Sequence, residues 1–228
     1  MSLYGDYARE YAAHTAVSIY NARYERPAMI KRLGNVRGKR VLDAACASGE
    51  YTAHLLESGA EVLGIDKSQA MVDLAHERVG DRAQFLCRDL ATPLGGVESD
   101  AFDLVLSSLT LHYIEDWSVP LAEFRRVLRT GGRLLVSTHH PEMTLPQVEE
   151  YFSISRVTDV WNIGGKEHIS MFYHRPLQAI VNPILEAGFR LTTFLEPRLD
   201  DGGEVPPEAE HLRSRPWFLI IEAVRAGQ

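Results

Sequence analysis

The chain has 228 residues, a formal net charge of −7 and 45% hydrophobic residues. This length and apolar content are ordinary for one globular domain, so a single domain over residues 1–228 is expected. The acidic balance argues against a nucleic-acid partner, because binding to a phosphate backbone usually requires a concentrated basic surface. A small-molecule substrate is therefore favoured.

The ends and the cysteines indicate a cytoplasmic protein without a membrane partner. The first residues lack the apolar stretch of a signal peptide, and no later apolar run approaches membrane-spanning length. Cys46 and Cys87 have no metal-ligand spacing between them, and they fit reduced thiols. Neither a disulfide framework nor a zinc site is expected.

The N-terminal segment, residues 1–35, has a helical pattern of tyrosines and aliphatic residues. Pro27 predicts the start of a helix whose end is marked by Gly34. We expect this segment to form a helical lid, which lies across the open edge of the sheet that follows.

From Arg40 onward, strand and helix patterns alternate. The expected order is strand 40–45, helix 50–58, strand 61–65, helix 68–79, strand 83–87, strand 101–107, helix 116–129 and strand 132–138. Such alternation indicates a mostly parallel sheet with helices on both faces. Residues 36–140 are therefore expected to form the cofactor-binding core of a three-layer, doubly wound α/β fold.

The alternation stops after residue 140. Two β-rich runs, 151–161 and 167–174, flank a Gly-Gly pair and predict a β-hairpin, so residues 141–175 are expected to be an insertion over the substrate pocket. Residues 176–228 contain helix 176–187, strand 189–196, a polar loop at 197–215 and strand 216–224. The last two strands are joined without a helix, which predicts a seven-stranded sheet whose final strand is antiparallel to its neighbour.

A strand, an acidic residue and a small-residue turn stand at the start of this core. The strand from Arg40 leads to Asp43, and small residues up to Gly49 precede the next helix. Small side chains at such a turn allow the backbone to approach a ligand closely. Asp66 ends the second strand, and a carboxylate there can accept hydrogen bonds from two vicinal hydroxyls, which predicts a nucleoside cofactor with its ribose on Asp66.

The order and spacing of these pieces resemble the class I S-adenosylmethionine-dependent methyltransferases, in particular the type 11 small-molecule group. In that family the first loop has an acidic residue followed by three alternating glycines, whereas this chain reads Asp43-Ala44-Ala45-Cys46-Ala47-Ser48-Gly49, with alanine at two glycine positions. Because alanine restricts positive φ, either the backbone there stays in a permitted region or the loop is slightly displaced.

The resemblance implies S-adenosyl-L-methionine as the cofactor and assigns residues to it by position. The first loop, with Asp43, Ala45, Cys46, Ala47 and Gly49, would lie beside the methionine part. Asp66 would bind the ribose, Lys67 and Met71 would flank the adenine, Asp89 with Leu90 would meet the adenine amino group, and the carbonyl of Ser107 would accept from the cofactor ammonium. Met71 fits the core equally well.

Two histidines are candidate catalytic bases. His112 follows the fourth strand of the core, at the edge of the substrate pocket in the related family, and His140 follows the fifth. Either would assist by taking the proton of a hydroxyl or phenol acceptor, whereas a carboxylate, amine or thiolate acceptor requires no base. Local packing is an equal interpretation for His112. No set of ligands completes a metal site around the adjacent histidines, so no metal is expected.

The expected function is methyl transfer to a small molecule through an O, N, C or S atom. Two alternatives remain open. A nicotinamide-dependent oxidoreductase also has an acidic residue after its second strand, but its glycine loop needs a G-x-G-x-x-G spacing that this chain lacks. A non-catalytic member of the methyltransferase fold would use the crevice for binding alone. The sequence is also compatible with a homodimer.

Overall fold

The computed structural model describes residues 4–199 and 202–227. The main-sheet strands are β1 (Arg40–Ala44), β2 (Glu61–Asp66), β3 (Gln84–Cys87), β4 (Phe102–Ser107), β5 (Leu128–His139), β8 (Phe189–Leu195) and β9 (Phe218–Arg225). The hairpin strands are β6 (Ser155–Ile163) and β7 (Lys166–His174). The helices are α1 (Ala8–Val17), α2 (Arg26–Leu33), α3 (Glu50–Glu57), α4 (Gln69–Val79), α5 (Ser118–Val127), α6 (Pro141–Thr144) and α7 (Leu177–Glu186). All strands and helices of the predicted core are present, in the predicted order.

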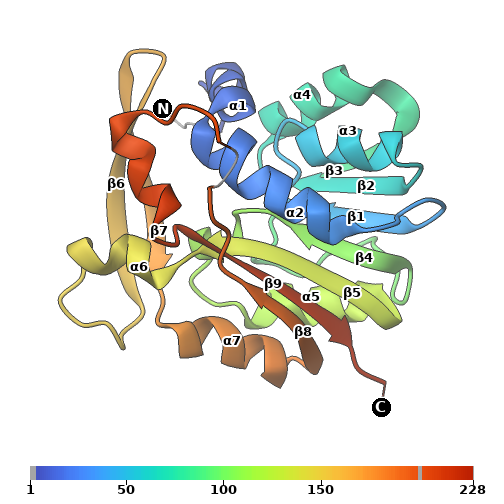
Figure 1. Ribbon diagram of the computed structural model, residues 1–228. Helices are drawn as coiled ribbons and strands as arrows, with labels where there is room; N and C mark the ends of the chain where they lie inside the picture. The colour runs from blue at the N-terminus through green and yellow to red at the C-terminus, as the bar shows by residue number, and fades with distance from the viewer. Residues whose placement is uncertain (1–3, 200–201, 228) are drawn as a thin grey trace.

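The described residues form one seven-stranded sheet in the order β3-β2-β1-β4-β5-β9-β8, with helices on both faces (Figure 1). β1 to β5 run parallel, and β9 is antiparallel to both of its neighbours. The predicted three-layer α/β fold with an antiparallel last strand is therefore confirmed. The described helices are all too short or too polar to cross a lipid bilayer.

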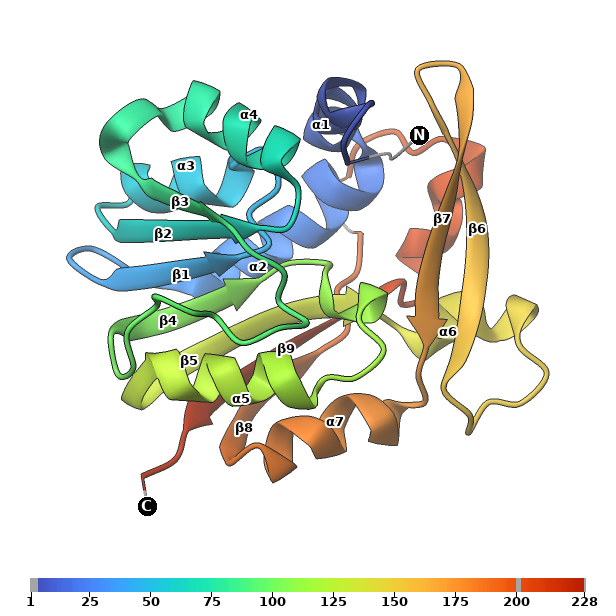
Figure 2. The ribbon, with the colours of Figure 1, turned by 180° about the vertical axis from the view of Figure 1, so that it is seen from behind.

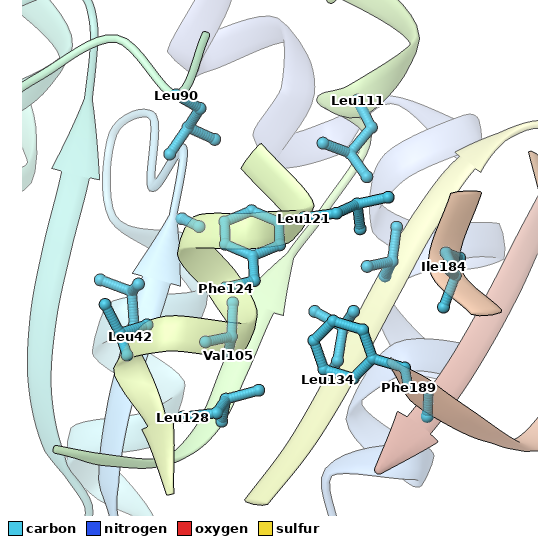
Figure 3. Packing of buried hydrophobic residues seen from close by; sticks show 14 of the residues in the cluster. Leu42, Leu90, Val105, Leu111, Leu121, Phe124, Leu128, Leu134, Ile184 and Phe189 are labelled. Carbon is cyan, nitrogen blue, oxygen red and sulfur yellow. The ribbon is translucent and has the colours of Figure 1, made fainter. Parts of the chain in front are cut away.

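Side chains alternate between the two faces of the sheet and divide the core in two. On one face, α5 and α7 pack with Phe124 and Ile184 over Val105 and Leu134 (Figure 3). On the other face, α2, α3 and α4 contribute buried residues that include Met29, Leu33, Leu55 and Val79. The expectation that the N-terminal segment lies across the sheet edge is wrong for α2, because its apolar side chains need the broad face of the central strands.

One boundary error falls at the start of β6, which begins at Ser155 and not at residue 151, and another falls between α5 and β5. The sequence predicted a helix up to residue 129 and a strand from residue 132, but the helix ends at Val127 and the strand begins at Leu128. Leu128 is fully buried and pairs with Phe102, so burial on the sheet outweighs helix propensity there. Gly131, with φ +77°, lies within the strand, where the pairing with β4 shifts register.

The hairpin forms a separate two-stranded sheet beyond the carboxyl end of β5, beside α1 (Figures 1 and 2). Its turn is Gly164–Gly165, and both residues have positive φ, as a two-residue hairpin turn requires. Tyr11 of α1 stacks on Trp161 with ring centroids 6.4 Å apart. The hairpin therefore packs against the N-terminal helix α1.

Candidate active site

A cavity of about 140 Å³ lies where β1, β2 and β4 end. Its lining comes from the N-terminal segment (Tyr4, Tyr11, Thr15, Asn21, Arg26), the region after β1 (Ala45, Cys46, Ala47, Glu50, Tyr51), the ends of β2 and β3 (Asp66, Lys67, Arg88, Asp89, Leu90) and the region after β4 (Ser108, Leu109, Thr110, Tyr113, Ile114). This position is a topological switch point, because β2 and β4 lie on opposite sides of β1, and open α/β sheets bind ligands at such points.

The loop after β1 keeps a glycine-like conformation although it contains alanines. Ala45 and Ala47 have φ of +70° and +46°. The left-handed region costs an L-residue about 1–2 kcal/mol, but hydrogen bonds to β2 hold the loop. The N–H groups of Ala45 and Cys46 donate to the carbonyl of Ile65 at 2.7 and 2.9 Å. The alternative in which the alanine backbone avoids positive φ is therefore wrong.

Asp66 is fixed at the end of β2 by two backbone donors. Its Oδ2 accepts from the N–H of Ala47 at 3.0 Å, and its Oδ1 accepts from the N–H of Ser68 at 2.9 Å. Burial raises the pKa of Asp66, and the backbone bonds oppose that shift. The backbone of Lys67 also contributes a hydrogen bond, and since a carboxylate has about four lone-pair sites, it can still accept from a hydroxyl of a ligand.

The residues that the sequence predicted to contact the adenine of the cofactor, apart from Met71, also lie in the cavity wall. Lys67, Asp89 and Leu90 line it together with Asp66. Asp89 also accepts from the N–H of Ala91 at 2.9 Å, so it forms a turn as well as part of the wall. The structure therefore brings together the residues that follow β2 and β3, as parallel strands with a common edge require.

Two of the predicted cofactor residues lie beneath the loop instead of in the described lining. Asp43 is 1% exposed, and its Oδ2 accepts from Thr52 Oγ1 at 2.6 Å. Burial raises the pKa of Asp43 to about 7. A Cβ at Gly49 would lie 3.1 Å from the Cβ of Ala75, so this glycine allows α4 to approach the loop. Both residues support the loop from behind.

Met71 and Ser107 also lie outside the described lining of the cavity. Both are fully buried, so Met71 belongs to the core, which was the other interpretation of its position. Ser108, one residue further along, lines the cavity, and the predicted role of the Ser107 carbonyl stays a prediction. Cys46 does line it, and burial raises the pKa of its thiol well above the usual range. A buried, protonated thiol favours packing over nucleophilic chemistry.

The two candidate bases do not reach the described lining of the cavity. His112 stacks on His139 with ring centroids 3.6 Å apart, and burial lowers the pKa of both rings, that of His139 to about 3. His140 caps α6, because its Nδ1 accepts from the N–H of Glu142 at 3.0 Å. Its Nε2 lies 2.9 Å from Glu196 Oε1. Both histidines therefore have structural partners of their own.

The N-terminal segment contributes site residues that the sequence did not single out. Tyr4 makes edge contacts with Tyr11 and Tyr113, with centroids 4.9 and 6.1 Å apart. Desolvation raises the pKa of all three phenols. The tyrosines were expected as part of a lid, but Tyr113 was passed over beside His112. The only available signal was the helical spacing of aromatic residues.

Arg26 is the second site residue that was missed. Within the described part of the chain, its buried Nε has no hydrogen-bond partner, and Nη2 donates to the carbonyl of Thr15 at 3.3 Å. The guanidinium lies 6.0 Å from the ring of Tyr51, which also lines the cavity. A charged residue before Pro27 is typical of an exposed helix start, so the sequence held no signal for it.

Comparisons with known proteins agree with this site. Residues 42–136 match the family model described as a methyltransferase domain. A solved structure from Listeria monocytogenes, assigned to the S-adenosylmethionine-dependent methyltransferases, has a TM-score of 0.78 at 27% identity, over 89% of this chain and 97% of that one.

Two curated relatives catalyse different methylations. A demethylmenaquinone methyltransferase of Clavibacter sepedonicus is 34% identical over 54% of this chain and 50% of its own length. A malonyl-[acyl-carrier protein] O-methyltransferase of Yersinia pestis is 30% identical over 82% of this chain and 66% of its own. The chain thus spans about half to two thirds of these relatives.

Residues 42–136 form a methyltransferase domain, and the fold is that of the class I S-adenosylmethionine-dependent methyltransferases, which the sequence pattern resembles. The protein is an enzyme whose cofactor is S-adenosylmethionine. The residues present fit that group, because the cavity combines a carboxylate with free acceptor sites, a guanidinium whose Nε is unpartnered among the described residues, and aromatic rings.

Proposed function

We propose that the enzyme transfers the methyl group of S-adenosylmethionine to a small organic acceptor bound under the N-terminal lid. The observation that supports this most strongly is the position of Asp66, which lies in a cavity wall with acceptor capacity that the protein backbone leaves unused. When bound, the cofactor supplies an electrophilic methyl group on a sulfonium. The protein has to hold a nucleophile in line with that carbon and exclude water.

Each part of the cofactor has a matching group in the wall. Asp66 would accept from the ribose hydroxyls, and Lys67 with Leu90 would flank the adenine. Arg26 would bind the amino-acid carboxylate, because a guanidinium forms paired bonds with carboxylates. The backbone of the loop Ala45–Ala47 would lie beside the methionine chain.

The wall favours an acceptor that is already deprotonated at neutral pH. The described lining contains no histidine, and desolvation keeps Tyr4, Tyr11 and Tyr113 protonated by raising the pKa of each phenol. A carboxylate, thiolate or stabilised carbanion needs no base, whereas an alcohol does. The names of the relatives, one acting on demethylmenaquinone and one on a malonyl group, support a small acidic or conjugated acceptor.

For a phenol or alcohol acceptor, His112 would remain the candidate base because it directly precedes Tyr113 in the cavity wall. His140 would act only through a change in its contacts with Glu142 and Glu196. A His112→Ala variant with an unchanged pH profile of turnover would remove His112 from that role.

Titration calorimetry with S-adenosylhomocysteine, followed by label transfer from methyl-labelled cofactor into small acids and phenols, tests the proposal. We expect saturable binding and transfer to at least one of these acceptors. Binding of S-adenosylhomocysteine without any transfer would favour the non-catalytic alternative. Binding of NADH without binding of S-adenosylhomocysteine would favour the oxidoreductase alternative.

A further inference from the structure

We infer that Glu25 is a positioning residue that fastens the N-terminal lid to the methionine end of the cofactor site. This inference rests on the proposed function, because it assigns a role in binding the amino-acid part of the cofactor. Glu25 ends a π-helical turn, Ile19–Glu25, and directly precedes Arg26 at the start of α2. Short π-helical segments occur frequently at functional sites.

Glu25 is a buried carboxylate bonded to hydroxyl groups from three separate parts of the fold. It is 1% exposed. Its Oε2 accepts from the hydroxyl of Tyr51, on α3, at 2.7 Å. Its Oε1 accepts from Ser108 Oγ, after β4, at 2.8 Å and from Ser137 Oγ, on β5, at 2.5 Å. One side chain therefore ties the lid to α3 and to two strands.

A buried carboxylate of this kind adds little to the free energy of unfolding. Removing a charged group from water is costly, and an apolar side chain of similar size is often as stable or more stable at a buried position. Desolvation raises the pKa of Glu25, and the hydrogen bonds from Ser137, Tyr51 and Ser108 oppose that shift. We therefore attribute Glu25 to the positioning of its hydrogen-bond partners and not to the stability of the fold.

Those partners form the cavity wall. Tyr51 and Ser108 line the cavity directly. Ser137 Oγ and the carbonyl of Ser137 both accept from the N–H of Leu109 at 3.0 Å. Leu109 also lines the cavity and has φ +45°, a conformation that a leucine keeps only when its surroundings hold it. Glu25 thus positions one wall of the cavity through its hydrogen-bond partners. It also positions Arg26, which is the next residue in the chain.

The expected consequence is selective loss of binding at one end of the cofactor. S-adenosylhomocysteine contains the amino-acid part, whereas 5′-methylthioadenosine has the same nucleoside without it. Glu25→Gln is nearly isosteric, but its amide nitrogen is a donor and cannot accept from the hydroxyls. We expect this variant to lose about tenfold in affinity for S-adenosylhomocysteine and to bind 5′-methylthioadenosine within about twofold of the wild type.

Calorimetry of both ligands with Glu25→Gln, Arg26→Gln and the surface control Glu57→Gln tests this inference. Arg26→Gln should show the same selective loss, and Glu57→Gln should show none, because Glu57 is exposed at the end of α3. Should Glu25→Gln fold poorly, Tyr51→Phe removes one donor to Glu25 and should give a smaller loss of the same selectivity.

Equal weakening of both ligands, or unchanged affinities, would overturn the role of Glu25. Equal weakening together with a lower melting temperature would indicate a merely structural residue. A wild-type protein that binds neither ligand would overturn the proposed function as well, whereas strong wild-type binding with an unchanged ligand preference in Glu25→Gln would overturn this inference alone.

A second, independent observation concerns the outward face of the hairpin. Val160 and Ile169 are paired across β6 and β7 and are 55% and 70% exposed. Met171, Phe152 and Ile154 are also at least half exposed nearby in the chain. Val160, Ile169 and Met171 lie on the same face of the hairpin, and an exposed apolar patch of this kind marks an interaction site. We infer that it is a contact between two copies of this chain.

Charge favours a second copy as the occupant. Arg156 and Glu167 lie at opposite ends of the same face, so the face is close to neutral although the chain has a net charge of −7. A two-fold axis across the strands would lay the Arg156 end of one copy over the Glu167 end of the other, and the apolar rows between them would meet. An isologous dimer requires such self-complementarity.

Sedimentation equilibrium tests this contact. We expect a wild-type dimer, a monomeric Ile169→Glu variant, and an unchanged dimer for Val17→Glu, which places the same charge on an exposed valine of α1. Arg156→Glu should weaken the dimer, and adding Glu167→Arg should restore it. A monomeric wild type at about 100 μM, well above the micromolar range of moderate affinities, would overturn the inference, as would a dimeric Ile169→Glu variant or a monomer that binds phosphatidylcholine vesicles.

Discussion

The two walls of the cavity differ in what holds them in place. On the sheet side, backbone groups position the Ala45–Ala47 loop and Asp66, through bonds of 2.7 to 3.0 Å. On the lid side, the wall includes tyrosine rings that pack edge to face. A cavity of about 140 Å³ is below the roughly 300–1,000 Å³ usual for small-molecule sites.

The largest expected effect is on the sheet wall at Asp66. Asp66→Ala removes a charged acceptor of the ribose hydroxyls and should weaken binding of S-adenosylhomocysteine by about 1.5–3 kcal/mol, or roughly 10- to 150-fold. Calorimetry measures this directly. Glu61→Ala, at the exposed opposite end of β2, should leave the affinity unchanged.

An unchanged dissociation constant in folded Asp66→Ala would refute the placement of the ribose. Tyr4→Phe provides the matching test of the lid, and it should change the affinity by less than about threefold, because the variant loses only a hydroxyl and keeps a ring that can contact Tyr11 and Tyr113. If Tyr4→Phe lost as much affinity for S-adenosylhomocysteine as Asp66→Ala, the two walls would not differ in their contribution to binding.

The next largest effect is expected on the free energy of unfolding, at Gly64, which packs beneath the loop after β1. A Cβ added there would lie 2.5 Å from Phe85 Cδ1 and 3.1 Å from Cys46 Sγ, so Gly64→Ala pushes on β3 and on the loop together. Overpacking of this kind costs about 1–3 kcal/mol. Urea denaturation should show that loss. Gly95→Ala is the control, because nothing among the described residues lies within 4 Å of a Cβ there. Equal stability of the two variants would contradict a closely packed sheet wall.

A pH-dependent effect is expected from Asp43 beneath the loop. Burial raises its pKa to about 7 from the ordinary value of 3.8, so between these values the folded protein holds a proton that the unfolded chain has released. Its contribution to the free energy of unfolding is full below the ordinary value and is lost as the pH rises through about 7. The loss approaches 1.4 kcal/mol per pH unit for one proton.

Denaturation of the wild type and Asp43→Asn at pH 5, 6, 7 and 8 measures this contribution. The advantage of the wild type over Asp43→Asn should shrink by about 1 kcal/mol per pH unit between pH 5 and 7. Asp73→Asn, which changes an exposed carboxylate on α4, should run parallel to the wild type. Parallel curves for Asp43→Asn would mean that Asp43 is ionised in the folded protein.

The smallest effect is expected at Ala47. Glycine relieves the positive φ of +46°, but it also adds freedom to the unfolded chain, worth about 0.4–1 kcal/mol. Ala47→Gly should therefore change the free energy of unfolding by less than about 1 kcal/mol. A melting-temperature scan would detect a larger change. A strong destabilisation would show that the alanine methyl group packs against the loop in a way that glycine cannot replace.

The sheet wall was predictable because its elements are contiguous in the sequence. Asp66 ends an apolar strand and Gly49 ends a small-residue turn, and parallel strands bring their carboxyl ends to one edge. The hairpin was also predictable, from two β-rich runs around Gly164 and Gly165. The boundary at Leu128 was not, since burial against Phe102 decides it and local propensity does not.

Contacts between distant segments explain the errors at the site. Glu25 meets Ser137 across 112 residues of chain, and no local pattern distinguishes it from an exposed glutamate. His112 had the residue type and position of a base, but its stacking on His139 depends on how β5 lies beside the segment after β4. Asp43 and Met71, which the resemblance assigns to the cofactor, are buried behind the described lining of the cavity.

By itself, the sequence determined the order of strands and helices, the doubly wound sheet and the place of Asp66 at a strand end, because hydrophobic periodicity and turn residues act over short stretches of chain. The identity of the cofactor came from the resemblance to the methyltransferase family. The tertiary structure alone decided which side chains close the cavity. Tyr4, Glu25 and Arg26 come to the site from a segment that precedes the sheet, since burying the apolar side chains of α2 on the central strands places them there.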